Sequence, residues 1–257
     1  MMIIKINMYT GDGEDQELYA VYKGEIMMLT VTPKLPGENN KHYSYRIIKN
    51  GIMSLELKPG QAISEVELAN ELRISRTPIR EVIGKLKEEH LVEVWPQVGS
   101  YISKIDYKLV KEAAFMRSVL EKEILKLACE SIADETLVEL KSVISLQESI
   151  VGKKGMERKF HELDQEFHSL FYKDQEKEHI WDAINRLSTH YNRIRLLSEI
   201  EYDYTDIIEQ HKNIINIIEN KRVDQIDEVI NHHILGPEKY WNNLLEPDSQ
   251  YAEYFVE

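Results

Sequence analysis

The sequence predicts a mainly α-helical protein, in which a small unit of helices and a β-hairpin precedes an antiparallel α-helical bundle. Three observations support this fold class. Apolar residues recur at i, i+3, i+4 and i+7 over most of residues 106–235, which is typical of amphipathic helices. Residues 43–104 combine helix-capping signals with two short β runs. The chain of 257 residues is also long enough for two domains, each with its own core.

The composition excludes several classes of protein. With 42% hydrophobic and 30% charged residues, the chain is neither disordered nor fibrous. Its longest apolar runs, such as IMMLTV at 26–31, are too short to cross a membrane, and its first residues lack the pattern of a signal peptide. Cys129 is the only cysteine, so no intrachain disulfide can form. We therefore expect a cytoplasmic protein with no membrane partner.

Residues 1–42 are expected to form an N-terminal extension. The runs MIIKINMY, ELYAVYKG and EIMMLTVTP predict short strands, separated by the turn-rich GDGED and KG. PKLPGENNK then predicts a loop. The extension either packs on the main body or forms a poorly ordered arm, and its sequence indicates no function.

Residues 43–104 begin with two predicted helices. The first, YSYRIIKNGIMSLEL, has apolar residues at helical spacing and ends at LKPG, where Pro59 and Gly60 interrupt it. Ser64 followed by Glu67 forms a capping box for the second helix, SEVELANEL.

A turn at Arg73 and Ile74 leads into a third predicted helix, SRTPIREVIGKLKEEH. Ser75 caps this helix, and Pro78 lies in its first turn, where a missing N–H costs nothing. The runs LVEVW and SYIS around PQVG then predict a β-hairpin. Two helices joined by a tight turn and followed by a hairpin form a winged helix-turn-helix. The second helix of such a pair enters the DNA major groove with its N-terminal residues at the base edges.

The start of the third helix and the hairpin supply the candidate DNA-binding residues. They are Ser75, Arg76, Thr77, Arg80 and Gly99. Arg76 and Arg80 lie one turn apart. An arginine guanidinium can donate two hydrogen bonds at once, to a guanine edge or to two phosphate oxygens. The hydroxyls and free N–H groups of a helix start suit phosphate. The alternative is that the two arginines form a solvated face with Glu81, but the capping box, the turn and the hairpin favour DNA binding.

The charge is unevenly distributed along the chain. The net charge is −13 and the isoelectric point about 5.3, which by themselves argue against nucleic acid as a partner. Residues 1–40 contribute −3, residues 41–104 contribute +2 and residues 105–257 contribute −12. A mildly basic block inside an acidic protein is compatible with DNA binding by that block alone.

From residue 106 onward, nearly the whole chain is predicted to be helical. The predicted helices are 107–131, 134–151, 156–173, 177–199, 204–220 and 223–235. Short breaks at glycine or aspartate separate several of them, which indicates an antiparallel bundle of about six helices. We assign residues 105–236 to this helical domain and residues 237–257 to a C-terminal tail without a clear pattern.

Seven of the nine histidines lie between residues 161 and 233. Asp164 and His168 are spaced i, i+4, which places them on one face of a helix. His211 borders the apolar stripe of the fifth predicted helix, and on the sixth the spacing turns His233 nearer the core than His232. Three imidazoles and one carboxylate suit a divalent transition metal. The alternative is that these are unrelated surface residues.

The segment PGQAISEVELANELRISRTPIREVIGKLKEEHLVEVWPQVGSYIS resembles the DNA-binding domain of GntR-type bacterial transcription regulators. SRTPIREVIGKL is similar to the recognition-helix signature of that family. The resemblance implies that the five candidate DNA-binding residues named above contact the operator. Val66 stands where the family often has arginine, and the wing segment WPQVGS is less basic than usual, so two sources of phosphate contacts are missing.

Residues 107–235 resemble the FCD-type ligand-binding domain that accompanies this winged helix in the FadR-like branch of the family. FMRSVLEKEILKLACE, LDQEFHSLFY, EQHKNIINIIENK and VINHHIL carry the resemblance. It implies a divalent metal held by Asp164, His168, His211 and His233. It also implies that a small carboxylic or sugar acid binds as the effector, with arginine pairing its charge.

Three arginines are candidate effector-binding residues. Arg117 matches a position that faces the pocket in the family, and Arg193 and Arg195 lie on the fourth predicted helix, where they could line the same pocket. The alternative is that these arginines form surface ion pairs with nearby glutamates.

The sequence therefore predicts a ligand-responsive, homodimeric regulator that binds a double-stranded DNA operator, one half per subunit. Zinc is the expected metal, with nickel or manganese as alternatives. One rival function is a metal-dependent hydrolase or other metalloenzyme that uses the Asp/His site. Against it, the sequence places no general base beside the ligands, because Glu166 points away from them. A second rival is a regulator that binds DNA without any ligand.

Overall fold

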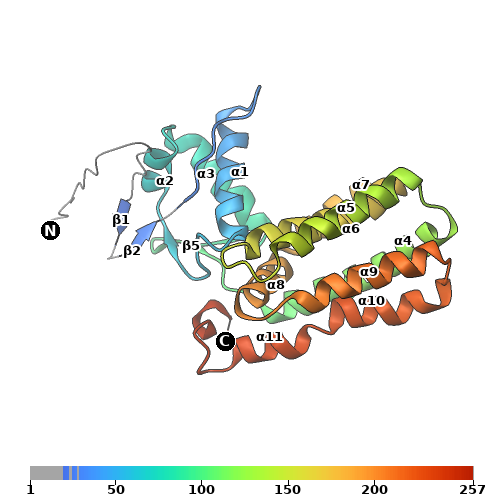
Figure 1. Cartoon of the computed structure of the whole chain (residues 1–257). Helices are drawn as coiled ribbons and strands as arrows, with labels where there is room; N and C mark the ends of the chain where they lie inside the picture. Colours follow the sequence, from blue (N-terminus) through green and yellow to red (C-terminus); the bar gives the residue numbers. More distant parts are fainter. Residues whose placement is uncertain (1–19, 23–24, 28, 257) are drawn as a thin grey trace. The chain divides into compact units, whose positions relative to one another are not determined.

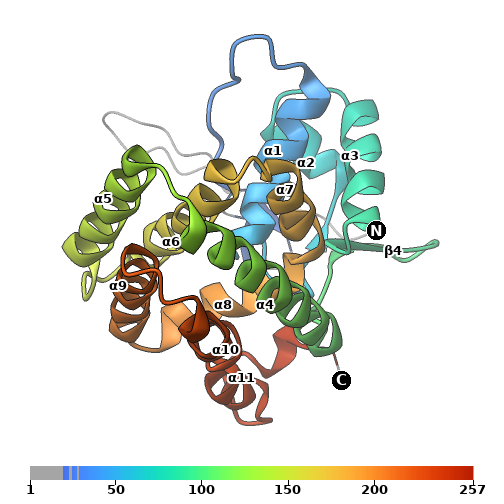
Figure 2. The ribbon, with the colours of Figure 1, turned by 90° about the vertical axis from the view of Figure 1, so that its right-hand side faces the viewer.

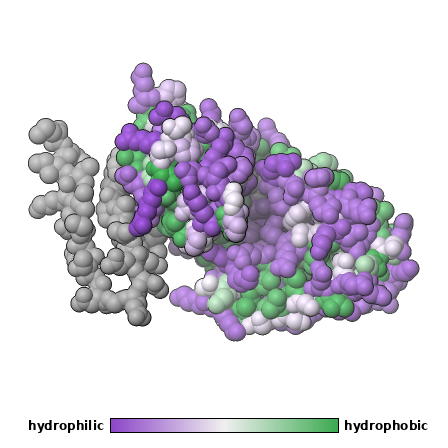
Figure 3. Space-filling view, turned by 90° about the horizontal axis from the view of Figure 1, so that it is seen from above, coloured by the Kyte–Doolittle hydropathy of each residue, from purple (hydrophilic) through white to green (hydrophobic). Residues whose placement is uncertain are grey.

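The computed structural model describes residues 20–22, 25–27 and 29–256, and the chain divides into two compact units, residues 1–102 and 103–257 (Figure 1). Helices dominate both units, which confirms the predicted fold class. Among the described residues, no helix is both long and apolar enough to cross a membrane. The surface visible in Figure 3 is mainly hydrophilic, as expected for helices that turn their apolar faces inward.

Over its described residues, the first unit contains three helices and a small sheet. After an N-terminal hairpin its elements are α1 (Asn40–Met53), β3 (Ala62–Ile63), α2 (Glu65–Glu71), α3 (Arg76–Glu88), β4 (Val92–Trp95) and β5 (Gly99–Ile102). β5 pairs antiparallel with β4, as the hairpin prediction requires, and also with β3, a strand that the sequence did not predict. The succession of α2, a turn, α3 and the hairpin is the predicted winged helix-turn-helix.

Capping residues set the helix boundaries of the first unit. Ser64 is the N-cap of α2 and accepts a hydrogen bond from the Glu67 N–H at 3.4 Å, as predicted. Ser75 is the N-cap of α3, but its hydroxyl makes no capping hydrogen bond. The predicted limits of α1 are wrong at both ends. Asn39 caps the helix earlier than expected, and the left-handed backbone at Leu55, with φ of 62°, follows its end before the LKPG segment is reached.

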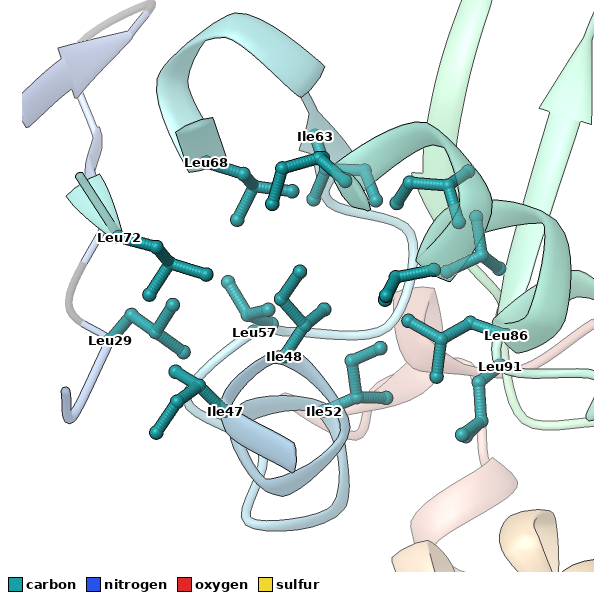
Figure 4. Packing of buried hydrophobic residues seen from close by; sticks show 14 of the residues in the cluster. Leu29, Ile47, Ile48, Ile52, Leu57, Ile63, Leu68, Leu72, Leu86 and Leu91 are labelled. Carbon is teal, nitrogen blue, oxygen red and sulfur yellow. The ribbon is translucent and has the colours of Figure 1, made fainter. Parts of the chain in front are cut away.

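The core of the first unit lies between α1, α2 and α3, where the side chains labelled in Figure 4 point toward one another. The members with no exposed surface are Ile48, Ile52, Leu57, Leu68, Ile79, Val82, Leu86 and Leu91. Each such side chain contributes about 1.5–3 kcal/mol of burial free energy. Since α3 turns Ile79, Val82 and Leu86 into this core, its opposite face, with Arg76 and Arg80, stays in solvent.

The N-terminal extension is described in part. β1 (Ala20–Tyr22) and β2 (Glu25–Met27) form an antiparallel hairpin, which confirms strands in two of the three predicted runs. The remaining run, MIIKINMY, lies outside the described residues. No regular helix or strand occurs in residues 30–38, in agreement with most of the predicted loop.

The second unit is a bundle of helices, drawn from green to red in Figures 1 and 2. Its α-helices are α4 (Tyr107–Glu130), α5 (Asp134–Ile150), α6 (Glu157–Asp174), α7 (Glu178–Leu187), α8 (Thr189–Glu201), α9 (Thr205–Glu219), α10 (Ile226–Leu235) and α11 (Glu238–Leu245). Two short 3₁₀ helices, η1 (Val223–Gln225) and η2 (Ala252–Tyr254), complete it. α5 lies beside α6 and α9 beside α10, while α4 packs against α6, α8 and α10.

The prediction of one continuous helix over 177–199 is wrong, because the helix is interrupted at Ser188, whose φ of −96° and ψ of 22° are not helical. α7 buries only Ile184, whereas α8 buries every residue from Thr189 to Leu197. The break allows an amphipathic surface helix to be followed by one that runs through the interior. The tail also contains α11, which the sequence did not predict and which is anchored by the buried Trp241.

Candidate functional site

The start of α3 presents the candidate DNA-binding residues to solvent. Ser75, Arg76, Thr77 and Arg80 are exposed, as is Gly99 at the beginning of β5. The uncapped hydroxyl of Ser75 leaves the first N–H groups of α3 accessible to an anion. Gly99 has φ of +154°, a backbone conformation that favours glycine.

Arg80 has a partner that sequence reasoning missed. Its Nη2 and Nε lie 3.0 and 3.2 Å from Oε2 of Glu65, at the start of α2. The Arg80 side chain is nevertheless 74% exposed, so the outer edge of its guanidinium faces solvent. The contact joins α2 and α3, the two helices of the helix-turn-helix, and restrains an arginine side chain that would otherwise be free to rotate. The ion pairs differ from the alternative in which Arg76 and Arg80 form a face with Glu81, because Glu81 pairs with Lys41 and Arg80 with Glu65.

The second unit brings the predicted metal ligands together. Asp164 and His168 lie on α6, His211 on α9 and His233 on α10. One ligand atom from each residue lies within 4.8 Å of the others, and all four residues are buried. These residues are therefore not surface groups, and His232, which stays exposed, is not a member of the cluster.

Each histidine of the cluster has a side-chain oxygen close to its outer nitrogen. The Nδ1 atoms of His168, His211 and His233 lie 2.9, 3.0 and 2.7 Å from side-chain oxygens of Glu121, Gln147 and Gln210, respectively. Because those oxygens accept, each Nδ1 carries a proton, and in a neutral imidazole this leaves the lone pair on Nε2. A carboxylate or amide behind the imidazole is the arrangement that fixes the tautomer of metal-ligating histidines.

The three Nε2 lone pairs converge on one point. Nε2 of His233 is 3.0 Å from Nε2 of His168, and Nε2 of His211 is 3.5 Å from Oδ1 of Asp164. Burial lowers the pKa of His211 to about 4 and that of His233 well below its usual value, so both imidazoles are neutral at pH 7. Lone pairs and a carboxylate oxygen facing one another without a proton repel, and a cation among them removes that repulsion.

Two buried arginines flank the cluster. Nη2 of Arg195 lies 2.7 Å from Oδ2 of Asp164, and although burial alone would raise the pKa of Asp164, this arginine holds it well below its usual value. Arg117 forms a buried ion pair with Glu121, four residues further along α4. Burial opposes ionisation of Glu121 too, but Arg117 and His168 lower its pKa to about 2. The cluster is thus a strongly polar centre inside an apolar bundle.

The same two arginines carry unused hydrogen-bond donors. Their guanidinium carbons lie 5.6 Å (Arg117) and 5.7 Å (Arg195) from the centroid of the Tyr191 ring. Among the described residues, Nη2 of Arg117, Nη1 of Arg195 and the hydroxyl of Tyr172 are buried without a hydrogen-bond partner. Buried donors of this kind are costly unless an acceptor reaches them. The arrangement suits an anionic ligand next to the Asp/His cluster.

The structure does not bring Arg193 to this cluster. Its Nη1 donates to the carbonyl oxygen of Ser103 at 2.7 Å, and its Nη2 donates to the Ser103 hydroxyl at 3.1 Å. On α8, Arg195 follows Arg193 by two positions, so the two side chains point in different directions. None of these arginines forms the surface ion pair considered as the alternative, because all three are buried.

Sequence reasoning missed the residues that support the cluster. Glu121 could have been found, because it follows Arg117 by four residues and so shares its helix face. Gln147 and Gln210 give no such signal, since a glutamine in a helix is usually exposed. Their role depends on which helices are neighbours.

Comparison with known proteins agrees with both units. Residues 44–102 match the family described as bacterial regulatory proteins, gntR family, and residues 112–236 match the FCD domain. The solved structure of McbR/YncC from Escherichia coli covers 81% of this chain and all of its own, with a TM-score of 0.68 and 17% identity, which shows the same fold.

Curated relatives extend over both domains. The chain is 28% identical over 211 residues to the HTH-type transcriptional repressor RspR of Escherichia coli (strain K12), covering 80% of this chain and 91% of the repressor. It is 30% identical over 184 residues to an HTH-type transcriptional regulator of Streptomyces ambofaciens, covering 71% and 76%. These relatives are regulators and not enzymes, so a metal-dependent hydrolase is not favoured. The chain belongs to the GntR family of bacterial transcription regulators and carries an FCD domain behind its winged helix-turn-helix.

Proposed function

We propose that this regulator is a cytoplasmic homodimer whose operator binding responds to a small carboxylic or sugar acid held beside a divalent metal. The observation that carries the proposal is the convergence of Asp164, His168, His211 and His233, all buried, with ligand atoms within 4.8 Å of one another. The start of α3 supplies DNA contact through Arg76, with Ser75, Thr77, Arg80 and Gly99.

The donor set fits a divalent transition metal. Three imidazoles favour zinc or nickel, while the carboxylate also admits manganese, and zinc is the first choice. Glu121, Gln147 and Gln210 would hold the imidazoles in the ligating tautomer. When bound, the metal would supply a Lewis-acidic centre for an anionic ligand. Arg117 and Arg195 would pair the charge of that ligand through the donors they leave unused.

Elemental analysis combined with a thermal-shift screen tests the proposal. We expect about one divalent transition metal per chain, because an uncompensated buried cluster of this kind is costly. In a screen of small carboxylic and sugar acids, at least one should raise the Tm of the metal-loaded protein but not of the chelator-treated protein. A protein that takes up none of zinc, nickel and manganese would contradict the proposed site.

Replacement of Gln147 by leucine is expected to weaken metal binding about 10–100-fold, as for other changes behind a metal-ligating histidine. The substitution removes the acceptor for the His211 Nδ1–H while keeping a similar volume at a fully buried position. Competition with a fluorescent chelator measures the affinity. Gln165→Leu on α6 is the control, because Gln165 hydrogen-bonds to no ligand residue among those described. Equal losses in both variants would mean that the amide does not orient His211.

We expect the protein to be a dimer in solution and to need two operator half-sites. The winged-helix segment of residues 41–104 has a net charge of only +2, so one copy makes few phosphate contacts. Two copies related by a two-fold axis double these contacts and match a pseudo-palindromic operator. Light scattering gives the mass, and gel shifts compare full operators with single half-sites. A monomer that binds a half-site as tightly as the full operator would contradict this expectation.

A further inference from the structure

A four-residue linker, residues 103–106, joins β5 of the first unit to α4 of the second. It belongs to the second unit and is buried there: Ser103 is 4% exposed and Ile105 is fully buried. A short connection between domains is usually exposed and mobile. This one is held by hydrogen bonds to two other parts of the second unit.

The first of these parts is the buried helix α8. Arg193 donates two hydrogen bonds to Ser103, one to its carbonyl oxygen and one to its hydroxyl, at 2.7 and 3.1 Å. His190 accepts a hydrogen bond at its Nδ1 from the Asp106 N–H at 3.0 Å. Burial lowers the pKa of Arg193 to about 9, and among the described residues no carboxylate pairs with it. A guanidinium is costly to bury without a carboxylate partner, so fixing the linker to α8 in this way lowers the stability of the fold.

The second part is the end of the C-terminal tail. Ile105 forms a parallel bridge with Phe255: the Ile105 N–H donates to the carbonyl oxygen of Tyr254 at 2.7 Å, and the Val256 N–H donates to the carbonyl oxygen of Ile105 at 3.1 Å. Phe255 is 5% exposed, which anchors the bridge. The matched FCD domain ends at residue 236, so this contact comes from a segment outside the family pattern.

The opposite side of α8 faces the Asp/His cluster. Arg195 binds Asp164 at 2.7 Å, and the ring of Tyr191 lies beneath the Arg117 and Arg195 guanidinium groups. Within six residues, α8 thus contacts the candidate metal centre through Arg195, which lies over the Tyr191 ring, and the linker through His190 and Arg193. The tail is also attached to α8, because Trp241 of α11 packs edge-on against Tyr191 with ring centroids 5.6 Å apart.

We propose that residues 103–106, clamped between α8 and residues 254–256 of the tail, couple the Asp/His cluster to DNA binding, and that the tail is a working part of this coupling. The inference rests on the proposed function. A cation bound to Asp164 weakens the attraction between Asp164 and Arg195, and α8 shifts as a result. Arg193 and His190 transmit this shift to the linker. The tail keeps the linker on α8, so that the shift moves the chain that leads into the wing strand β5.

Val256→Pro tests the role of the tail with little other disturbance. Proline removes the N–H that bonds to Ile105, while the Val256 side chain is already 51% exposed. Phe255 has φ of −103° and ψ of 152°, a conformation that a residue before proline accepts. Val256→Ala is the matched control, because it shortens the same side chain and keeps the N–H. A second variant, ending at Ser249, removes both tail hydrogen bonds.

Hydrogen exchange of the full chain, chelator-treated and zinc-reloaded, gives the readout at the amides of Ile105 and Asp106, whose N–H groups donate to Tyr254 and His190. In the parent protein and in Val256→Ala, we expect the exchange rates of these amides to differ at least about fivefold between the chelator-treated and the zinc-reloaded protein. In Val256→Pro and the truncated protein, the difference should disappear while zinc content stays at the parent level. The metal dependence of binding to an operator selected from random DNA should fall in parallel.

The possible outcomes separate this inference from the proposed function. If the parent protein takes up none of zinc, nickel and manganese, both the metal site and the coupling are wrong. If zinc binds but exchange at the linker amides is the same in both states, the metal site stands and the coupling is wrong. If the parent shows the difference and Val256→Pro keeps it, α8 alone holds the linker and the tail has no part in the coupling.

Discussion

Replacement of His233 by alanine is expected to abolish metal binding and to lower the Tm of the metal-loaded protein by about 10 °C. A ligand present at about a thousand times its Kd stabilises the folded state by about 4 kcal/mol. For a domain of this size, each kcal/mol shifts Tm by about 2–4 °C. Elemental analysis gives the metal content, and differential scanning calorimetry of the metal-loaded and chelator-treated proteins gives the Tm.

His232→Ala is the matched control for this result. His232 precedes His233 on α10 but is exposed, whereas His233 is buried and faces His168. The control should keep its metal and its Tm. After chelation, the parent protein and His233→Ala should melt within a few degrees of each other, because most of the loss comes from the metal and not from the missing side chain. Equal metal loss in both variants would mean that His233 is not the fourth ligand.

Simultaneous replacement of Arg76 and Arg80 by alanine is expected to reduce specific operator affinity at least about 30-fold. A single arginine that reads a base contributes about 1–3 kcal/mol, and both side chains lie on the exposed face at the start of α3. Fluorescence anisotropy at several salt concentrations measures the affinity. The dependence of log K on log salt should become shallower, since fewer phosphates are neutralised.

Lys87→Ala is the control for charge alone. Lys87 lies in the last turn of α3, away from the helix start, and is exposed, so its loss removes one positive charge without removing a base contact. It should weaken specific and non-specific DNA binding to a similar, small extent. In the variant lacking Arg76 and Arg80, affinity for the operator should fall much more than affinity for non-specific DNA. If the double variant binds the operator as the parent does, another surface reads the DNA.

The local patterns of the sequence were sufficient to predict most of the helices and the helix-turn-helix formed by α2 and α3. Ser64 and Glu67 mark the start of α2, Pro78 lies in the first turn of α3, and the apolar period of 3.6 residues locates the bundle helices to within a residue or two at most ends. These signals are local, because capping and amphipathicity depend on residues within one or two turns. The same spacing placed Asp164 and His168 on one helix face, and the resemblance to the FCD domain selected His233 over His232.

Only the tertiary structure decided which groups lie behind the ligands and where each arginine points. Gln147 and Gln210 orient histidines 64 and 23 residues away, so no pattern along the chain could mark them. Arg193 and Arg195 look equivalent in sequence, yet one holds the linker and the other holds Asp164. The reason is that α8 is buried on all sides, and a helix without a solvent face shows no amphipathic period from which the direction of a side chain can be inferred. What each of its residues contacts depends on the neighbours that the folded bundle brings to it.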